Sequence, residues 1–177
     1  MMAQRAALLV DGTHVGISAG RQGMELDYGL LLKYVKQGGR GRVDGGFDRD
    51  VVVARVYVGP TANPTRGRRR FLDYLARLGY QANVCQEEGS SLKTGVDQEI
   101  MHDILVLTLT GRVDAIVLVT GDAGFMKGIR TAQSHGVQVE VLGFAETTAE
   151  VLMHETQFRD LVDTVLLRAT GVRGKGR

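Results

Sequence analysis

Short apolar runs alternate with segments of helical periodicity along most of this chain, and this alternation limits the folds open to it. Apolar or β-branched runs predict strands at residues 6–10, 51–58, 80–85, 115–119 and 137–142. Apolar side chains at helical spacing predict helices at residues 25–36, 65–78, 96–110, 124–134 and from 148 into the 160s. Strands and helices that alternate in this way form a parallel sheet covered on both faces. We therefore predict an α/β fold, a three-layer sandwich with a mainly parallel central sheet and Rossmann-like topology.

The length of 177 residues suits one domain, which we place at residues 1–165. Residues 37–50 are rich in glycine and charge, so they are expected to form a flexible surface loop within it. Residues 166–177 are expected to form a basic tail, with Arg168, Arg173, Lys175 and Arg177. No internal repeat or long linker divides the chain.

Composition narrows the location of the protein and its partners. No apolar run approaches the roughly 20 residues that span a bilayer, so we expect no membrane association. The first residues lead directly into a predicted strand without the regions of a secretory signal, and Cys85 is the single cysteine. A lone cysteine cannot form an internal disulfide, so we expect a cytoplasmic protein.

Aspartates follow the ends of predicted strands or open the helix after one. Asp11 ends the first apolar run, Asp122 follows the run at 115–119, and Asp97 opens the helix predicted at 96–110. Ligands of open parallel sheets bind outside the carboxyl ends of the strands, where these side chains would converge. Carboxylates gathered there repel one another unless a hard cation such as Mg²⁺ or Mn²⁺ neutralises them. The pattern therefore favours metal-dependent hydrolysis of a phosphodiester.

Each aspartate also has a simpler interpretation. Asp11 suits a turn, Asp122 suits the N-cap of the helix after it, and Asp97 suits a first helical turn. Capping explains each residue singly, but it does not require the three to share one edge of the sheet.

The motifs around these residues are Val10-Asp11-Gly12, Lys93-Thr94-Gly95-Val96-Asp97 followed by Asp103, Val119-Thr120-Gly121-Asp122-Ala123-Gly124-Phe125, and Gly136-Val137-Gln138-Val139. In order and separation they resemble the NYN domain, the PIN-like ribonuclease fold that includes the LabA/DUF88 proteins. The resemblance extends from residue 6 to residue 161. It implies a PIN-like sheet with an acidic pocket that binds Mg²⁺ or Mn²⁺ and cuts RNA. Asp11, Asp97 and Asp122 would be the catalytic metal ligands, and Lys93 and Thr120 would line the pocket.

Two positions differ from the usual pattern of that family, and they leave two functions open. His14 replaces an asparagine, and Gly124 replaces a second aspartate. His14 can donate to a phosphate or bind Mn²⁺, whereas Gly124 removes a carboxylate from the pocket. The first function is a ribonuclease acting on RNA, with a single-stranded substrate favoured. The second is a catalytically inactive PIN-like domain that binds RNA or a protein partner.

Further expectations concern the residues around the pocket, the assembly of the protein and a third possible function. Asp103 lies six residues after Asp97, so on an ideal helix it points about 120° away and supports the pocket from behind. Basic side chains near the start of one helix could hold the RNA backbone, at Arg66, Arg68, Arg69 and Arg70, or could form a solvated face. Apolar residues of the last helix leave a homo-oligomer open. A nucleotide-binding α/β protein is less favoured, because residues 12–23 contain neither a P-loop nor a dinucleotide fingerprint.

Overall fold

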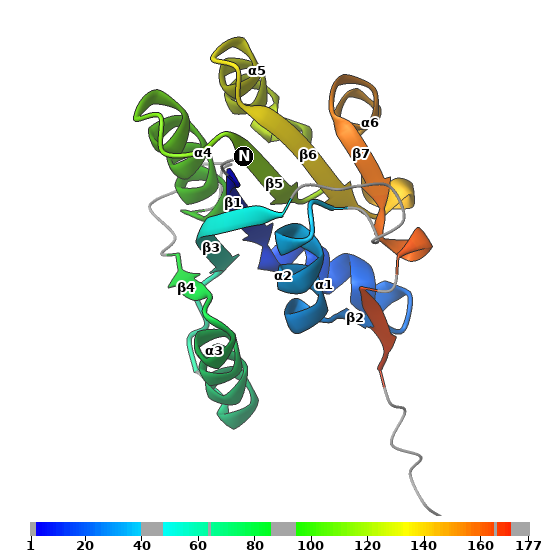
Figure 1. Ribbon diagram of the computed structural model, residues 1–177. Helices are drawn as coiled ribbons and strands as arrows, with labels where there is room; N and C mark the ends of the chain where they lie inside the picture. Colours follow the sequence, from blue (N-terminus) through cyan, green and yellow to red (C-terminus); the bar gives the residue numbers. More distant parts are fainter. Residues whose placement is uncertain (1–2, 40–47, 64, 86–94, 165, 171–177) are drawn as a thin grey trace, which may run out of the picture.

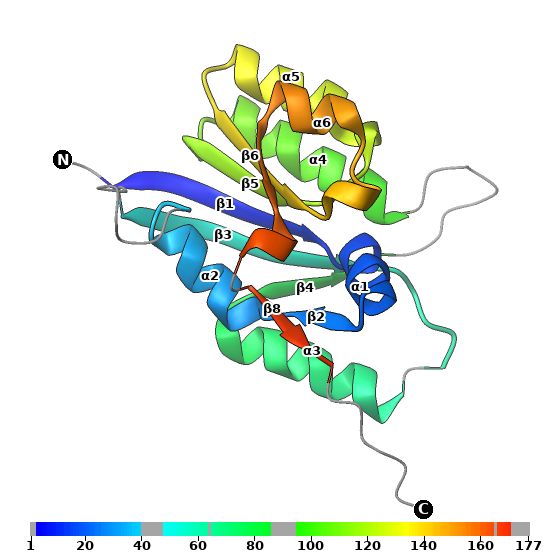
Figure 2. The same ribbon diagram turned by 90° about the vertical axis from the view of Figure 1, so that its right-hand side faces the viewer.

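The computed structural model describes residues 3–39, 48–63, 65–85, 95–164 and 166–170. Within this part of the chain, parallel strands form a central sheet between two layers of helices (Figures 1 and 2). The predicted α/β class and layered architecture are therefore confirmed. None of the described helices is both long enough and apolar enough to cross a bilayer.

The six-stranded sheet has the order β4-β3-β1-β5-β6-β7, and every neighbouring pair in it is parallel. Its strands are β1 (Gln4–Asp11), β3 (Arg49–Val58), β4 (Gln81–Val84), β5 (Ala115–Val119), β6 (Gln138–Gly143) and β7 (Gln157–Asp160). The two central strands, β1 and β5, are almost completely buried, as expected for strands that have helices on both sides. In their register Val10 lies beside Val119, so residues 11 and 120 leave the sheet side by side.

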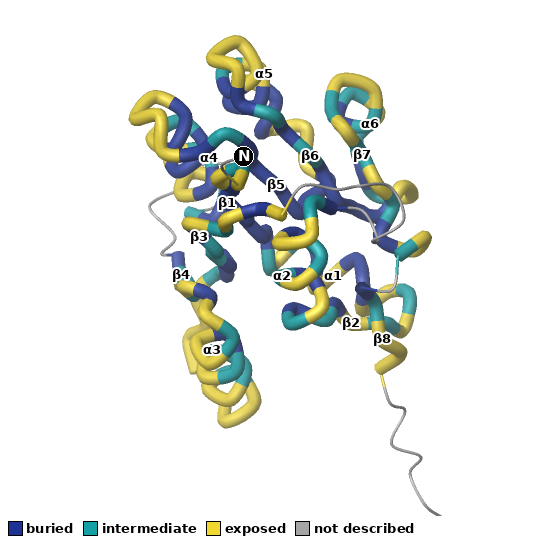
Figure 3. Tube along the Cα trace, in the orientation of Figure 1, coloured by how far each residue is buried: buried dark blue, intermediate teal, exposed yellow. Residues whose placement is uncertain are grey.

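Two apolar cores separate the layers (Figure 3). One core packs the sheet against α4 (Gly95–Leu109), α5 (Met126–Ser134) and α6 (Glu150–Glu155). The other packs it against α1 (Gly12–Arg21), α2 (Tyr28–Lys36) and α3 (Arg66–Leu78). Short 3₁₀ segments η2 (Ala123–Phe125), η3 (Ala145–Thr147) and η4 (Leu161–Asp163) turn the chain at the sheet edge.

The segment between β1 and α2 differs from the sequence analysis, which predicted neither a helix nor a strand between residues 10 and 25. It forms α1 and then the short strand β2 (Met24–Leu26). Glycine costs roughly 1 kcal/mol relative to alanine within a helix, and α1 contains Gly12, Gly16 and Gly20. Burial of Val15 and Ala19 in the core offsets this penalty. Gly12 also permits close packing, since a Cβ there would lie 2.9 Å from the Tyr57 carbonyl oxygen.

The last helix is shorter than predicted. It ends at Glu155, and the chain continues as β7, which pairs with β6. Apolar residues assigned to one helical stripe instead pack within the chain, with Leu152 and Leu161 fully buried and Phe158 against the core. These residues therefore belong to the core of this chain, and the possible homo-oligomer stays an expectation.

Strands form within two segments that were expected to be irregular. Strand β3 begins at Arg49 within the predicted loop, while residues 40–47 lie outside the described part of the chain. In the expected tail, β8 (Leu167–Ala169) pairs antiparallel with β2. Arg168 forms ion pairs with Glu25 and Asp27 there, at 3.5 and 3.2 Å, so it is not a free tail cation.

Candidate functional site: an acidic edge of the sheet

Asp11 ends β1 and is almost completely buried. Its Oδ1 accepts a hydrogen bond from the backbone N–H of His14 at 3.0 Å and caps α1. Its Oδ2 accepts one from the Thr120 hydroxyl at 3.2 Å. The sequence analysis assigned Asp11 to a turn, whereas the structure makes it the N-cap of α1, and capping occupies only one carboxylate oxygen. The other oxygen faces the end of the neighbouring strand.

Thr120 connects two of the predicted aspartates. Its buried hydroxyl donates to Asp11 and accepts from the backbone N–H of Asp122 at 3.3 Å. Asp122 itself is exposed, and its Oδ1 accepts from the Gly124 N–H at 2.8 Å as the cap of η2. Parallel pairing of β1 with β5 brings these residues together, although they are far apart in sequence.

Asp97 lies in the first turn of α4 and is half-buried. Together with Asp122 it lines a pocket of about 500 Å³, whose walls include Gln98, Met101, His102, Leu105 and Phe125. The sequence analysis gave no role to His102. Gln98, Met101, His102 and Leu105 follow the helical i, i+3, i+4, i+7 spacing, so this spacing carried a usable signal.

The electrostatics of Asp11 set it apart from an ordinary capping residue. Burial raises the pKa of its carboxyl, and the nearby charge of Asp97 raises that pKa further. The hydrogen bonds from His14 and Thr120 act in the opposite direction. Among the described residues, Asp11 and Asp122 have no arginine or lysine partner, and the nearby charge of His14 is what lowers the pKa of Asp11 besides these hydrogen bonds.

These residues fit a divalent cation only as a partial ligand set. No three or more His, Cys, Asp or Glu side chains of the described ranges group closely enough to hold a metal alone. Mg²⁺ commonly binds one or two carboxylates and completes its shell with water and substrate phosphate oxygens. Asp11 and Asp97, whose charges influence each other, suit that mode, with Asp122 on the same edge.

His14 occupies the position of the usual asparagine and lies behind this edge. Its Nε2 is buried and has no hydrogen-bond partner in the described part of the chain. A Cβ at Gly121 would lie 2.6 Å from that nitrogen, so the glycine makes room for the imidazole. A buried imidazole nitrogen of this kind can bond a ligand atom or a water molecule.

Gly124 lies beside the carboxylate of Asp122, at the position where the family usually has a second aspartate. A Cβ at Gly124 would lie 3.2 Å from Oδ1 of Asp122, so an aspartate side chain there would start next to that carboxylate. Lys93, the remaining predicted pocket residue, lies outside the described residues.

Asp103 is buried on the sheet side of α4, away from the pocket residues of that helix. It accepts hydrogen bonds from the Tyr57 hydroxyl and from Arg55, the latter at 2.6 Å. This ion pair and the Tyr57 hydrogen bond satisfy the carboxylate, so Asp103 ties α4 to β3 beneath the acidic edge. Desolvation and the Asp103 hydrogen bond both raise the pKa of Tyr57.

The arginines of α3 do not share one environment. Arg68 and Arg70 line a second pocket, which Thr13 also borders, whereas Arg66 and Arg69 are exposed and do not. Arg68 donates to the backbone carbonyl of Gly59 at the end of β3. The predicted cluster therefore divides into two pocket residues and two solvated ones.

Comparison with known proteins defines the family. The family model for the NYN domain matches residues 5–162, which includes every described part of the acidic edge. This chain belongs to the NYN domain family. NYN domains are PIN-like nuclease domains, so membership supports a ribonuclease-type function in general terms.

Two individual proteins are similar to this NYN chain. The uncharacterized protein MJ0482 of Methanocaldococcus jannaschii is 25% identical over 139 residues, which is 78% of this chain and 47% of MJ0482. The chain thus spans about half the length of that relative. The crystal structure of VPA0982, a protein of unknown function from Vibrio parahaemolyticus, matches with a TM-score of 0.74 and 23% identity. It covers 91% of this chain and 94% of its own, and it supports the fold alone.

Proposed function

We propose that this NYN domain, of the LabA/DUF88 type, is a metal-dependent ribonuclease that hydrolyses phosphodiester bonds in single-stranded RNA. The main support is the placement of Asp11, Asp97 and Asp122 along one edge of the sheet in a chain of this nuclease family. The free cysteine Cys85 is buried, which is compatible with the cytoplasmic location that we propose.

The side chains would divide the work as follows. Asp11 and Asp97, with Asp122 beside them, would hold Mg²⁺ or Mn²⁺ together with a phosphate of the substrate. A bound divalent ion supplies charge stabilisation at the phosphate and lowers the pKa of a coordinated water. Thr120 keeps Asp11 in place through its hydrogen bond to Oδ2. Lys93, which is not among the described residues, is proposed to contact the phosphate.

His102 adds an imidazole, which can donate or accept a hydrogen bond, to the same pocket. It is exposed and lines the wall beside Asp97 and Asp122, so it can reach a substrate oxygen at that edge. We assign it the role of donating a hydrogen bond or a proton to the RNA. His14, whose Nε2 lacks a protein partner, would help to position the substrate or an ordered water.

Cleavage of a fluorescently labelled single-stranded RNA, with Mn²⁺ or Mg²⁺ and with or without chelator, tests this proposal. Asp122→Asn should abolish metal-dependent cleavage while its circular dichroism spectrum and melting temperature stay those of the native protein. Asp114→Asn is a matched control, because Asp114 pairs with Arg5 at 2.7 Å at the opposite end of the sheet. Undiminished cleavage by the Asp122 variant would refute the site.

The alternative is an inactive PIN-like domain that binds RNA or a protein. Gly124 favours it, because the edge lacks the carboxylate that a side chain at this position could add beside Asp122. RNA binding without turnover in either metal would support this alternative. Restoration of turnover by Gly124→Asp would identify the missing carboxylate as the cause.

A further inference from the structure

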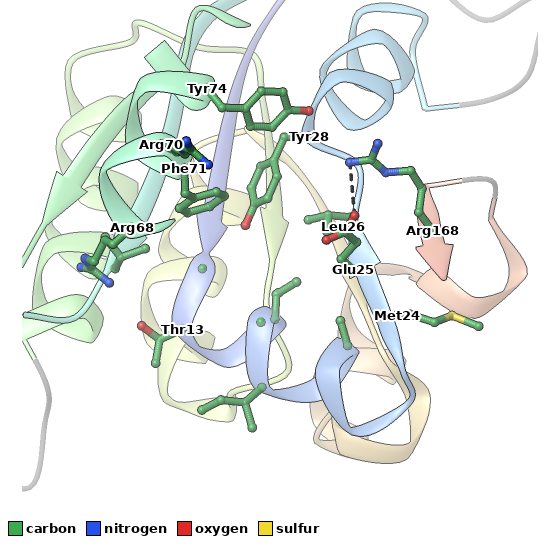
Figure 4. Close-up of a pocket in the computed structure, with 16 residues that line it drawn as sticks. Thr13, Met24, Glu25, Leu26, Tyr28, Arg68, Arg70, Phe71, Tyr74 and Arg168 are labelled. Atoms are coloured by element: carbon green, nitrogen blue, oxygen red, sulfur yellow. Dashed lines mark ion pairs between the residues drawn. The ribbon is translucent and has the colours of Figure 1, made fainter. Parts of the chain in front are cut away.

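A second pocket lies on the α1–α3 side of the sheet, next to the acidic edge (Figure 4). It has a volume of about 720 Å³ and is lined by residues from α1, β2, α2 and α3 and by Arg168 of β8. Gly12 and Thr13, which directly follow Asp11 in the chain, form part of its wall. The pocket therefore begins where the acidic edge ends.

Aromatic rings form one side of this pocket. Tyr28, Phe71 and Tyr74 line it, and the rings of Tyr28 and Phe71 meet edge to face at a centroid distance of 5.5 Å. Planar aromatic walls of this kind bind nucleobases in many proteins that recognise single strands, because every base offers a π face.

The Tyr28 hydroxyl carries the strongest indication of a ligand. The residue is only 7% exposed, and its hydroxyl makes no hydrogen bond to any residue in the described ranges. Figure 4 shows this hydroxyl directed into the pocket, toward the side of Thr13. Burial raises the pKa of Tyr28, and the charge of Asp11 raises it further. The hydroxyl is not one of the buried unpartnered atoms of the described residues, so it borders the open pocket, where a bound base edge can supply its hydrogen-bond partner.

The arginines that line the pocket differ in their ion pairing. Arg168 is held by Glu25 and Asp27, so its charge is already neutralised. Arg70 lines the pocket from α3, is exposed, and forms no ion pair within the described part of the molecule. It can therefore meet a phosphate, whereas its helix neighbour Arg69 is equally exposed but does not line the pocket.

We propose that this pocket is a nucleotide subsite, in which one base of the RNA strand contacts Tyr28 and Phe71 and an adjoining phosphate contacts Arg70. The proposal rests on the proposed function for the identity of the strand. It deepens that function in two ways. A base bound in the pocket would fix the position of the RNA strand relative to Asp11, and contacts to that base would add sequence recognition to contacts with the phosphate backbone.

Binding of a fluorescein-labelled single-stranded RNA, measured by anisotropy in EDTA so that no cleavage occurs, tests the subsite. Arg70→Gln should weaken binding about tenfold, because a charge-assisted contact is lost, while Arg69→Gln should stay within about twofold. Tyr28→Phe should weaken binding about threefold to tenfold, since it removes one hydrogen bond and keeps the ring. The hydroxyl has no partner in the described fold, so the melting temperature of Tyr28→Phe should match that of the wild type.

An oligonucleotide of abasic sites separates base recognition from charge. With it, Tyr28→Phe should bind as the wild type does, while the Arg70→Gln loss should persist. Equal losses for the Arg69 and Arg70 variants, together with no Tyr28 effect on normal RNA, would overturn the subsite and leave a diffuse basic surface.

Binding of mononucleotides distinguishes a free nucleotide from RNA as the ligand of the pocket. If AMP, CMP, GMP or UMP bound as tightly as the oligonucleotide, with the same dependence on Tyr28 and Arg70, the pocket would serve a free nucleotide and the RNA assignment would be overturned. Failure of the ribonuclease proposal is a separate result, because it would be seen as no cleavage by the wild type in Mn²⁺ or Mg²⁺ while binding in EDTA still showed the Tyr28 and Arg70 effects.

Discussion

At the amino end of the central sheet acidic side chains meet arginines, whereas at the carboxyl end Asp11 and Asp122 form no ion pair with an arginine or lysine of the described residues. Asp114, which precedes β5, pairs with Arg5 of β1, and Glu140 pairs with Arg49. Asp11 is held by a backbone N–H and by the Thr120 hydroxyl.

The pKa values follow this difference in surroundings. The Arg5 hydrogen bonds lower the pKa of Asp114, whereas burial and the charge of Asp97 raise the pKa of Asp11. The same residue type therefore stabilises the fold at one end of the sheet and stores unfavourable charge at the other. A site that is costly to fold and close to other carboxylates is typical of function.

The largest effect is expected from the buried ion pair at the amino end. Arg49→Met should lower the free energy of unfolding by about 3–5 kcal/mol, because it removes the buried cation that pairs with Glu140, whose side chain is only 12% exposed. Urea denaturation measures the loss. The double replacement Arg49→Met with Glu140→Leu should recover most of it, and a loss below about 1 kcal/mol for the single variant would show that the pair is solvated.

The second prediction concerns added metal at the carboxyl end. Mg²⁺ or Mn²⁺ should raise the melting temperature of the wild type, since ligand at 100 times its Kd stabilises a protein by about 2.7 kcal/mol. Differential scanning fluorimetry with and without EDTA measures this shift. Asp11→Asn should show no such shift, and Asp114→Asn should keep it in full. An identical shift in all three proteins would place the ion elsewhere.

A smaller effect, of opposite sign to that of Arg49→Met, is expected for Asp11→Asn in the absence of metal. Asparagine caps helices as well as aspartate does, so the variant keeps the cap and removes the buried charge. We expect a gain in stability of about 0.5–2 kcal/mol at neutral pH, together with loss of cleavage.

The pH dependence gives this prediction its sign. The pKa of Asp11 is raised in the folded state, so its contribution to stability is present below its unfolded pKa and is lost as pH rises through the folded pKa. The gain from Asp11→Asn should therefore be absent in acid and appear as pH rises through that window. Destabilisation of the variant at pH 7 in EDTA would show that the carboxylate is already neutralised by the protein.

The smallest effect is expected for Asp114→Asn, which breaks a half-exposed pair with Arg5. The loss should be below about 1 kcal/mol, because solvent screens such pairs. The lowered pKa of Asp114 gives it the opposite pH sign, with stability present above the unfolded pKa and lost as pH falls through the folded pKa. Urea midpoints of the variant and the wild type should converge in acid, and an unchanged difference there would contradict the pairing.

Apolar periodicity correctly predicted the helices and strands whose own apolar pattern fits one type of secondary structure. All five expected strands are present, and the strand at 115–119 has the predicted bounds. Helix α1 was missed because its glycines lower helix propensity while its stability comes from packing on the sheet. Strand β7 was assigned to a helix because Phe158 and Leu161 fit a helical stripe as well as they fit core positions of a strand and a turn.

For the candidate site, the sequence likewise predicted the position of residues in the fold but not their surroundings. Strand ends placed Asp11 and Asp122 on one edge, because parallel strands all leave the sheet on that side. The environment of each residue was not predictable from spacing: His102 lines the acidic pocket, Arg168 is paired, and only Arg68 and Arg70 of the basic cluster border the second pocket.

The sequence alone determined the layered parallel sheet and the edge at which acidic residues would collect, since both follow from local apolar patterning and from residue order. Only the tertiary structure decided which charges are neutralised. It packs Arg5 and Arg49 beside carboxylates at one end, whereas Asp11 at the other end has no arginine or lysine partner among the described residues. Pairing of this kind depends on distances between residues far apart in the chain, and no local pattern encodes those distances.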